Sequence, residues 1–212
     1  MSHTAGDNRT IEFPRGPFSP LVERALRTAA RAHRQHTRKA SDVPYVSHLA
    51  GVTLILCRAG FDDDAILAAA LLHDAVEDTD YTAETLAADF PPDVAAWVAA
   101  TTERKRDEHD RPRSWEDRKR EHLGQIAAAP LEARAIVLAD KLHNLGSMLY
   151  DRAAGEPLWE RFNAPRERVL WYHREMIERA AIGSDPHEKR DDRLAALAKS
   201  CREVLARLEE VG

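Results

Sequence analysis

Apolar residues recur at helical spacing along almost the whole chain after Ser19, and the alternation typical of half-buried strands hardly appears. The Ser19-Pro20 pair is typical of a helix N-terminus, and the apolar stripe behind it predicts a first helix running towards His36. A second helix is expected between Ser47, which can cap it, and Gly60, which can end it. This periodicity predicts an all-α protein.

A third helix, over residues 65–72, is predicted to lie at the centre of the fold. Its apolar residues occur nearly all round the helix, which is the mark of a buried element, and the aspartates at 62–64 supply acidic caps. Shorter helices are expected over residues 82–89 and 92–101. Strong helical periodicity then predicts longer helices over residues 114–128, 131–149 and 165–181.

The chain is expected to end in an amphipathic helix. Its apolar stripe consists of Leu194, Leu197, Cys201, Val204, Leu205, Leu208 and Val211. Docking on the protein's own core is the favoured interpretation of this stripe, and dimerisation is the alternative. The predicted organisation is a flexible N-terminus (residues 1–18), one helical domain (19–182) and a C-terminal amphipathic helix that packs on the domain (183–212).

Composition narrows the classes of function. A chain of 212 residues that is 43% hydrophobic can form one domain with a sizeable core. Its 31 basic and 36 acidic residues give a net charge of −5, which argues against a nucleic-acid-coating protein. Cys57 and Cys201 lie in apolar helical stretches without a CxxC partner and are expected to be reduced core residues. Neither a signal peptide nor a membrane span is expected, so we predict a cytoplasmic protein.

The segment from Glu103 to Arg120 contains almost only polar and charged residues, with both signs of charge mixed. Such segments are usually solvated, and this one is a candidate for a long mobile connection.

Candidate chemistry begins at residues 71–78, Leu-Leu-His-Asp-Ala-Val-Glu-Asp, which place one imidazole and three carboxylates within two helical turns. A catalytic divalent ion needs several imidazole or carboxylate ligands from different elements, with positions left open for water and substrate. His73 and Asp74 are adjacent and diverge on an ideal helix, so both can bind one ion only at a helix end or kink. The acidic stretch at 77–80 is a plausible helix end.

Two further ligands must come from other elements. His48 lies at the start of one predicted helix, and Asp140 lies inside another. Taken singly, each residue is more simply explained as a cap or a surface group. Asp140 is however flanked by Val137, Leu138 and Leu142, and a carboxylate is costly to bury there unless it is paired or metal-bound. The four residues together favour a metal site.

The order of His48, His73-Asp74 and Asp140 resembles the metal-binding pattern of the HD phosphohydrolase superfamily. The finer pattern resembles the hydrolase domain of RelA/SpoT homologues. It comprises Arg-Lys at 38–39, Pro-Tyr-Val-Ser-His at 44–48, Ala-Leu-Leu-His-Asp-Ala-Val-Glu-Asp-Thr at 70–79 and Leu-Ala-Asp-Lys-Leu-His-Asn-Leu at 138–145. The resemblance covers roughly residues 21–172, and the chain is similar to stand-alone small alarmone hydrolases.

The resemblance implies an HD-domain helical bundle with a metal site at its centre. It also implies hydrolysis of the 3′-pyrophosphate of guanosine tetra- or pentaphosphate, (p)ppGpp, to GDP or GTP and pyrophosphate. Mn²⁺ is the implied cofactor. By position, the implied metal ligands are His48, His73, Asp74 and Asp140, and the pair that would handle the attacking water is Glu77 and Asp78.

A pyrophosphorylated nucleotide also requires cations and polar contacts. The resemblance implies that Arg38, Lys39, Asn144 and Tyr172 contact the substrate. Lys141 and His143 share the third motif but would point away from Asp140 on an ideal helix, so we expect them to lie outside the site. The charged segment 103–120 falls where relatives have a shorter connection, so an enlarged lid with phosphate contacts is an alternative to a solvated loop.

Two other functions remain open. The same site could act on adenine alarmones or on the 2′-phosphate of NADPH, because the metal motif encodes neither the base nor the phosphate position. The chain could also be a nucleotide-binding HD module without turnover. The usual signature of such a module is a broken ligand set or a lost Glu-Asp pair, and both are intact here. We expect a small nucleotide as the partner, with no nucleic acid and no membrane, and make no prediction of the oligomeric state.

Overall fold

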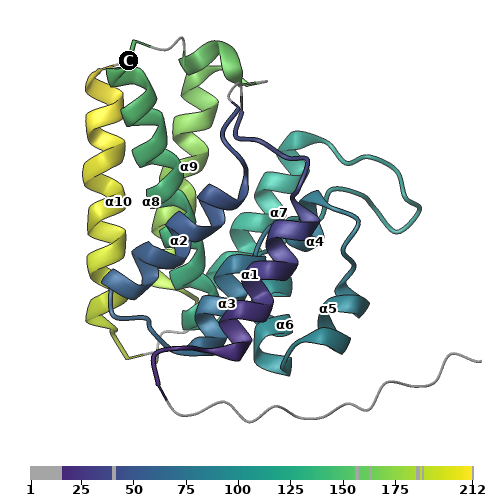
Figure 1. Ribbon diagram of the computed structural model, residues 1–212. Helices are drawn as coiled ribbons and strands as arrows, with labels where there is room; N and C mark the ends of the chain where they lie inside the picture. Colours follow the sequence, from purple (N-terminus) through teal and green to yellow (C-terminus); the bar gives the residue numbers. More distant parts are fainter. Residues whose placement is uncertain are drawn as a thin grey trace, which may run out of the picture.

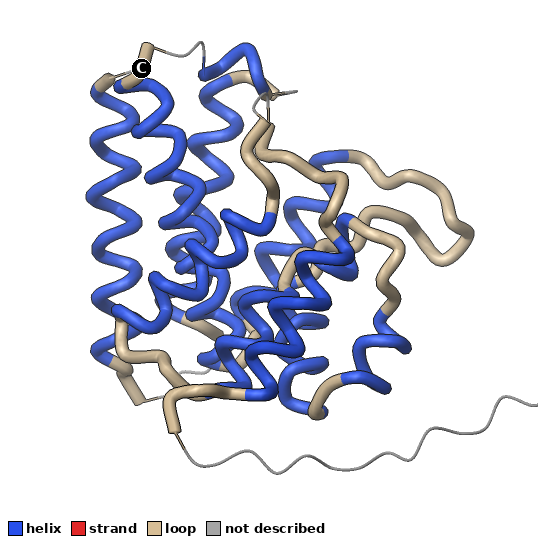
Figure 2. Tube along the Cα trace, in the orientation of Figure 1, coloured by secondary structure: helices blue, strands red, loops and turns tan. Residues whose placement is uncertain are grey.

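The computed structural model describes residues 16–39, 42–155, 158–162, 164–184, 187 and 189–211. These residues form helices, turns and loops without a β-strand (Figures 1 and 2), which confirms the predicted all-α class. In chain order the elements are α1 (Pro20–Ala32), α2 (Val46–Arg58), α3 (Asp64–Leu72), α4 (Ala75–Asp78), α5 (Ala83–Asp89), α6 (Pro92–Thr101), α7 (Trp115–Ala127), α8 (Leu131–Ala153), the 3-10 helix η1 (Leu158–Arg161), α9 (Arg166–Ile182) and α10 (Asp192–Glu210).

Helix α3 lies at the centre of the molecule, as its apolar sequence predicts. Asp63 caps the helix, because its side chain accepts a hydrogen bond from the Ala65 N–H at 2.8 Å. Every residue from Ile66 to Leu72 is buried, and α1, α2, α6 and α8 pack around the helix. This packing fixes the C-terminal end of α3, where His73 and Asp74 follow.

Helix α8, with 23 residues, is the second central element. Its residues from Ala133 to Asp140 are all buried, and α2, α6, α9 and α10 pack against it. Because α8 contacts both α2 and α3, side chains near its middle can reach residues at the ends of those helices.

The C-terminal helix α10 packs along α8 and α9 (Figure 1). Leu194, Leu197, Cys201, Leu205 and Leu208 of its apolar stripe are buried, and the Cys201 thiol donates to the Leu138 carbonyl at 3.2 Å. The stripe therefore faces the protein's own core.

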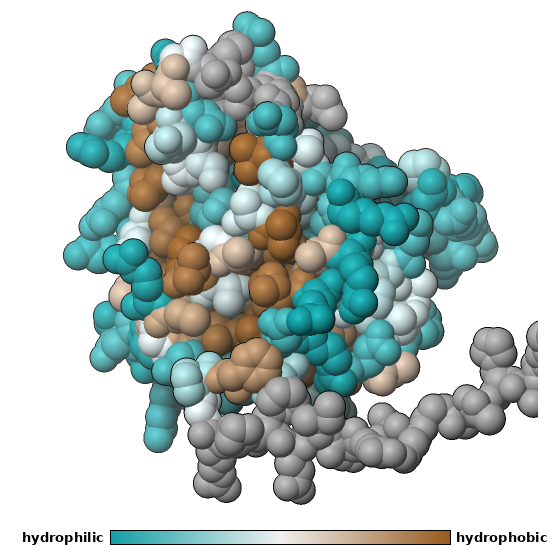
Figure 3. All heavy atoms as spheres, viewed as in Figure 1, coloured by the Kyte–Doolittle hydropathy of each residue, from teal (hydrophilic) through white to brown (hydrophobic). Residues whose placement is uncertain are grey.

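The exposed face of α2 carries apolar side chains and a cysteine. Figure 3 shows apolar residues gathered over this helix, where the side chain of Leu54 is 63% exposed. Cys57 lies one turn further along and is also exposed, so its prediction as a core residue was wrong. None of the described helices is both long and apolar enough to cross a bilayer.

Most of the predicted helix starts agree with the structure. Of the three residues expected at the ends of α1 and α2, Ser19 and Gly60 have the predicted role and Ser47 does not. The Ser19 hydroxyl accepts from the Val22 N–H at 3.2 Å, and Gly60 adopts a left-handed φ of 85° directly after α2. Ser47 does not cap α2, because the helix begins one residue earlier, at Val46, and Tyr45 is its N-cap residue. The predicted flexible N-terminus lies outside the described residues except for residues 16–18, which are exposed.

Candidate metal centre and active site

Three parts of the fold bring the predicted metal ligands to one point. His48 lies in the first turn of α2, Asp140 lies in the middle of α8, and His73 and Asp74 form the break between α3 and α4. The break occurs earlier than the expected helix end at 77–80. At this position the His73 Nδ1–H donates to the Ala70 carbonyl, 2.7 Å away, in the last turn of α3. The break allows the two adjacent side chains to converge.

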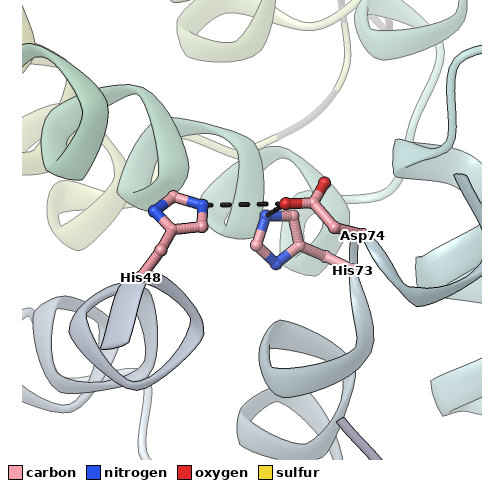
Figure 4. Close-up of side chains that lie close together, drawn as sticks. All are labelled: His48, His73 and Asp74. Atoms are coloured by element: carbon pink, nitrogen blue, oxygen red, sulfur yellow. Dashed lines mark ion pairs between the residues drawn. The ribbon is translucent and has the colours of Figure 1, made fainter. Parts of the chain in front are cut away.

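The four side chains are close together. His48 Nε2 lies 3.1 Å from Asp140 Oδ1 and 3.7 Å from Asp74 Oδ2, and His73 Nε2 lies 3.1 Å from Asp74 Oδ2 and 3.8 Å from Asp140 Oδ1. Figure 4 shows both imidazole rings directed at the Asp74 carboxylate. Two nitrogens and two oxygens therefore surround one small volume.

The two separations of 3.1 Å have the size expected between ligands of one divalent ion, and the other two are wider. One ligand atom from each of His48, His73 and Asp74 lies within 4.8 Å of the other two. Ligand atoms about 2.1 Å from an ion lie about 3.0–3.4 Å apart when the angles between them are octahedral or tetrahedral. His73 provides a second indication, because its Nδ1–H donates to Ala70 and its buried Nε2 has no hydrogen-bond partner among the residues that the structure describes. A buried lone pair facing two carboxylates favours a cation between them. The donor set of two imidazoles and two carboxylates thus matches the requirements of a divalent metal.

The electrostatics of the cluster also favour a cation. Burial raises the pKa of Asp74, but the neighbouring histidines outweigh this effect and hold it well below the usual range. The pKa of Asp140 is also lowered despite burial, chiefly by Lys141. Burial lowers the pKa of His73, but Asp74 and Asp140 attract a proton to the ring and raise it well above normal. Both carboxylates are therefore ionised and stabilise positive charge between them.

A further set of polar groups holds the two carboxylates in place. The Tyr45 hydroxyl donates to Asp74 Oδ2 at 2.6 Å. Lys141 Nζ donates to Asp140 Oδ2 at 2.7 Å, and Asn144 Nδ2 donates to Asp140 Oδ1 at 2.6 Å. The expectation that Lys141 points away from Asp140 was therefore wrong, because its long, flexible side chain turns back to the carboxylate. Such supporting contacts commonly orient metal ligands.

His143 also lies at the site, contrary to the expectation from an ideal helix. Its ring faces His48, with the two Nδ1 atoms 3.0 Å apart. If His48 Nε2 binds a metal, the proton of that ring is on Nδ1 and is donated to His143. Burial lowers the pKa of His143 to about 4, so its ring is neutral and can accept this hydrogen bond at neutral pH.

The predicted acidic pair lies beside the cluster on α4. Glu77 Oε2 accepts a hydrogen bond from the Glu103 N–H at 3.0 Å, and Glu77 Oε1 lies 3.3 Å from Lys105 Nζ. The same ammonium group is 2.5 Å from Asp78 Oδ1. Burial, the largest influence, raises the pKa of Glu77, which brings this carboxylate closer to the range of a proton acceptor at neutral pH.

The charged segment 103–120 divides into a loop and a helix. Residues 102–114, here called the 102–114 loop, project from the body of the molecule between α6 and α7 (Figure 1). An isolated bridge between Arg106 and Pro112 narrows this loop, and the Ser114 hydroxyl caps α7 by accepting from the Asp117 N–H at 3.1 Å. The base of the loop contacts the acidic pair through Lys105, and a lid function stays a prediction.

The four residues predicted to contact the substrate have different surroundings. Arg38 Nη2 donates to Asn144 Oδ1 at 2.8 Å, which links both residues to Asp140. Lys39 is exposed, with its Nζ 5.0 Å from the centroid of the Phe162 ring. Tyr172 is buried on α9, and its hydroxyl lies 2.9 Å from His122 Nδ1. The roles of all four residues in substrate binding stay predictions.

Sequence reasoning assigned no role to several residues that the structure places at the site. Tyr45 and His143 were visible within the matching motifs, but their partners belong to other helices. Glu103 and Lys105 open the charged segment, and nothing in their local sequence indicates that they reach Glu77 and Asp78.

Comparisons with known proteins identify relatives of this chain. A family model described as HD domain matches residues 25–159. The guanosine-3′,5′-bis(diphosphate) 3′-pyrophosphohydrolase MESH1 of Drosophila melanogaster is 39% identical over 141 residues, which cover 66% of this chain and 75% of that protein. A GTP pyrophosphokinase of Streptomyces coelicolor is 39% identical over 132 residues, which cover 61% of this chain but only 15% of that enzyme.

A solved structure supports the same relationship over nearly the whole chain. It is described as a metazoan ortholog of SpoT that hydrolyzes ppGpp and plays a role in starvation responses. The likeness has a TM-score of 0.72 with 28% identity, and it covers 93% of this chain and 98% of the other. From the family model and these relatives, the chain belongs to the HD domain family, among the relatives of guanosine-3′,5′-bis(diphosphate) 3′-pyrophosphohydrolases.

Proposed function

We propose that the protein hydrolyses the 3′-pyrophosphate of (p)ppGpp. Water adds to the phosphorus that is bonded to the 3′-oxygen, and the bond between that phosphorus and the 3′-oxygen breaks. A proton from the water ends on the 3′-oxygen, which leaves as the ribose hydroxyl. The products are pyrophosphate and GDP, or GTP from the pentaphosphate. The observation that carries the proposal is the convergence of His48, His73, Asp74 and Asp140 directly beside the acidic pair Glu77 and Asp78.

In this proposal the two imidazoles and two carboxylates hold one divalent ion, with Mn²⁺ as the expected metal. When bound, such an ion supplies Lewis acidity to water and to phosphoryl oxygens. Tyr45, Lys141, Asn144 and His143 keep Asp74, Asp140 and His48 in their orientations. The Ala70 carbonyl does the same for His73.

Glu77 and Asp78 handle the attacking water. Glu77 is suited to accept a proton, because burial raises the pKa of its carboxyl and the Glu103 N–H holds one of its oxygens. Its other oxygen faces Lys105, which also contacts Asp78, so one ammonium group fixes the separation of the two carboxylates.

The substrate carries several negative charges, and the site offers cations for them. Arg38 has a planar guanidinium group suited to two phosphate oxygens and is already aligned by Asn144. Lys39 is exposed on the same loop. These residues would bind and orient the nucleotide. Because the substrate is a nucleotide of the cell interior, we expect the enzyme to act in the cytoplasm.

The direct test is incubation of the purified, metal-stripped protein with ppGpp, ppApp and NADPH, with and without Mn²⁺, followed by ion-exchange separation of the products. We expect Mn²⁺-dependent release of pyrophosphate and GDP from ppGpp. The double variant Glu77→Gln/Asp78→Asn should bind Mn²⁺ and lose this activity.

The alternatives predict other products. Release of pyrophosphate only from ppApp would assign the site to adenine alarmones, and inorganic phosphate from NADPH alone would assign it to a 2′-phosphatase. Nucleotide binding without any turnover would identify a non-catalytic module and would overturn the proposal.

A further inference from the structure

Glu103 is a buried carboxylate to which the proposed chemistry gives no role. It lies two residues after the end of α6 and is only 5% exposed. Its Oε1 accepts from Arg118 Nη1 at 2.6 Å, and its Oε2 accepts from Lys119 Nζ at 2.5 Å. Arg118 and Lys119 lie on α7, so the carboxylate fixes the base of the 102–114 loop to that helix.

The backbone beside this carboxylate contacts the acidic pair. The Glu103 N–H donates to Glu77 Oε2 at 3.0 Å. Two residues later, Lys105 Nζ lies 2.5 Å from Asp78 Oδ1 and donates to the Glu77 carbonyl at 3.1 Å. Residues 102–105, here called the strap, therefore carry one backbone donor and one ammonium group to Glu77 and Asp78.

The acidic pair has few local constraints of its own. It lies on α4, which has only four residues and follows the break at His73 and Asp74. The cap residue of α4, Asp74, makes no side-chain hydrogen bond to the helix. Restraint of Glu77 and Asp78 must therefore come from contacts with other segments, and the strap supplies such contacts.

We propose that Glu103 is a positioning residue whose ion pairs with Arg118 and Lys119 hold the strap so that it fixes the Glu77 and Asp78 carboxylates. The inference rests on the proposed function of that pair. Displacements of about 1 Å at groups that support an active site can lower a rate about a hundredfold. Loss of the ion pairs should therefore slow the reaction more than it weakens substrate or metal binding.

The test compares Glu103→Gln with Glu116→Gln. The Gln side chain keeps the shape of Glu103 but removes its charge. Glu116 is a matched control on α7, because its pair with Arg168 spans 2.9 Å and both side chains are more than half exposed. We expect Glu103→Gln to lower kcat for ppGpp by roughly tenfold to a hundredfold, with smaller changes in KM and in Mn²⁺ affinity. Glu116→Gln should match the wild type.

A second readout separates positioning from a loss of folded protein. The titratable groups facing Glu77 are Asp74, Asp78, Lys105, Lys119 and Tyr172, and the Glu103 N–H bond lowers the pKa of Glu77. In Glu103→Gln the unpaired Lys119 by itself would lower this pKa further, so a rise reports the loss of the N–H bond. If the strap loosens, this carboxyl loses that bond, and the acidic limb of the kcat/KM profile should move to higher pH. A reduced fraction of folded enzyme would lower kcat without moving the limb. A folded Glu103→Gln with wild-type kcat and an unmoved limb would overturn the inference.

Two further measurements apply if Glu103→Gln does not fold or if the wild type does not hydrolyse ppGpp. If Glu103→Gln does not fold, Arg118→Gln is the replacement variant, because it weakens the same ion pairs from α7. It should give the same changes in kcat and in the pH profile to a smaller extent. Wild-type behaviour of Arg118→Gln would overturn the inference. If the wild type does not hydrolyse ppGpp, the proposed function fails. The role of the strap can then be tested by ¹³C NMR titration of the Glu77 carboxyl. The pKa of this carboxyl should be higher in Glu103→Gln than in the wild type. An equal pKa in the two proteins would contradict the inference.

Discussion

The ring of His143 lies directly against Gly51, one turn of α2 beyond His48. A Cβ atom built on Gly51 would be 2.2 Å from both Cδ2 and Nε2 of that ring. The close approach places His143 Nδ1 3.0 Å from His48 Nδ1. The glycine thus makes room for the side chain that orients a proposed metal ligand.

Gly51→Ala should lower the affinity for Mn²⁺ by about tenfold or more, because the displaced His143 ring can no longer hold His48. Stability should change little, since alanine in a helix is favoured over glycine by about 0.5–1 kcal/mol, which offsets the repacking. Isothermal titration calorimetry of the metal-stripped protein measures the affinity, and thermal unfolding without metal measures the stability.

Gly146→Ala is the matched control, because Gly146 lies on α8 and a Cβ there would meet nothing within 4 Å. Equal Mn²⁺ affinity in both variants and the wild type would show that His143 does not orient His48.

Among single residues, the sequence predicted the four proposed metal ligands but not the residues that hold them in place. His48, His73, Asp74 and Asp140 could be selected because imidazoles and carboxylates beside apolar runs are unusual, and because their order matches a known pattern. The contacts of Tyr45 with Asp74 and of His143 with His48 depend on how different segments pack together. The ideal-helix argument also failed for Lys141, whose side chain has enough rotatable bonds to reach its neighbour.

Among the elements, α6, the 102–114 loop and α7 are joined by the buried Glu103. Burial raises the pKa of this carboxyl, but contacts with His122, Lys119 and Arg118 outweigh it and lower the pKa to about 2, from an ordinary value of 4.5. A carboxyl with a lowered pKa in the folded state stabilises the fold above its unfolded pKa, and this stabilisation is lost as the pH falls through the folded value.

Glu103→Gln should therefore destabilise the protein by about 3 kcal/mol at pH 7, because it leaves Arg118 and Lys119 without their partner. The difference from the wild type should shrink as the pH falls from 4.5 towards 2, where the wild-type carboxyl also becomes neutral. Urea unfolding of both proteins across this range checks the sign. A difference that is independent of pH would contradict the ion-pair explanation.

The starts of the helices were predicted well where a side-chain cap is encoded. Ser19, Asp63, Thr82 and Ser114 each accept a backbone hydrogen bond at the expected helix start. The third helix was predicted to end at Leu72, as α3 does. The break that follows it was expected later, at residues 77–80, because its position depends on the hydrogen bond from His73 to Ala70 and on the surroundings of the ligand cluster. Ser47 failed as a cap because α2 begins before it.

For the whole molecule, the proposed ion would connect α2, the junction of α3 and α4, and α8. A ligand that binds only the folded state stabilises it, by about 2.7 kcal/mol at a hundredfold excess over Kd. For a chain of this length we expect Mn²⁺ at that excess to raise Tm by roughly 5–10 °C. Differential scanning calorimetry of the metal-stripped protein with and without Mn²⁺ measures the shift.

Asp74→Asn keeps the shape of the side chain but removes one anionic ligand, so the Mn²⁺-induced rise in Tm should be largely lost. A rise as large as that of the wild type would show that the ion binds elsewhere. EDTA should reverse the rise in the wild type.

The all-α architecture followed from periodicity alone, because nearly every apolar segment has helical spacing. The meeting point of α2, α3 and α8 did not, since periodicity says which face of a helix is buried but not which helix covers it. That arrangement came only from the resemblance to a family with a known order of ligands.

In the proposed reaction, this site breaks the bond between the 3′-oxygen and phosphorus of an alarmone and depends on a bound metal ion. The most direct test is ³¹P NMR of ppGpp hydrolysis by the Mn²⁺-loaded protein in ¹⁸O-labelled water. We expect pyrophosphate carrying one ¹⁸O atom and unlabelled GDP, with no reaction after chelation. Inorganic phosphate as the first product, label in the GDP, or intact ppGpp despite bound Mn²⁺ would contradict the account.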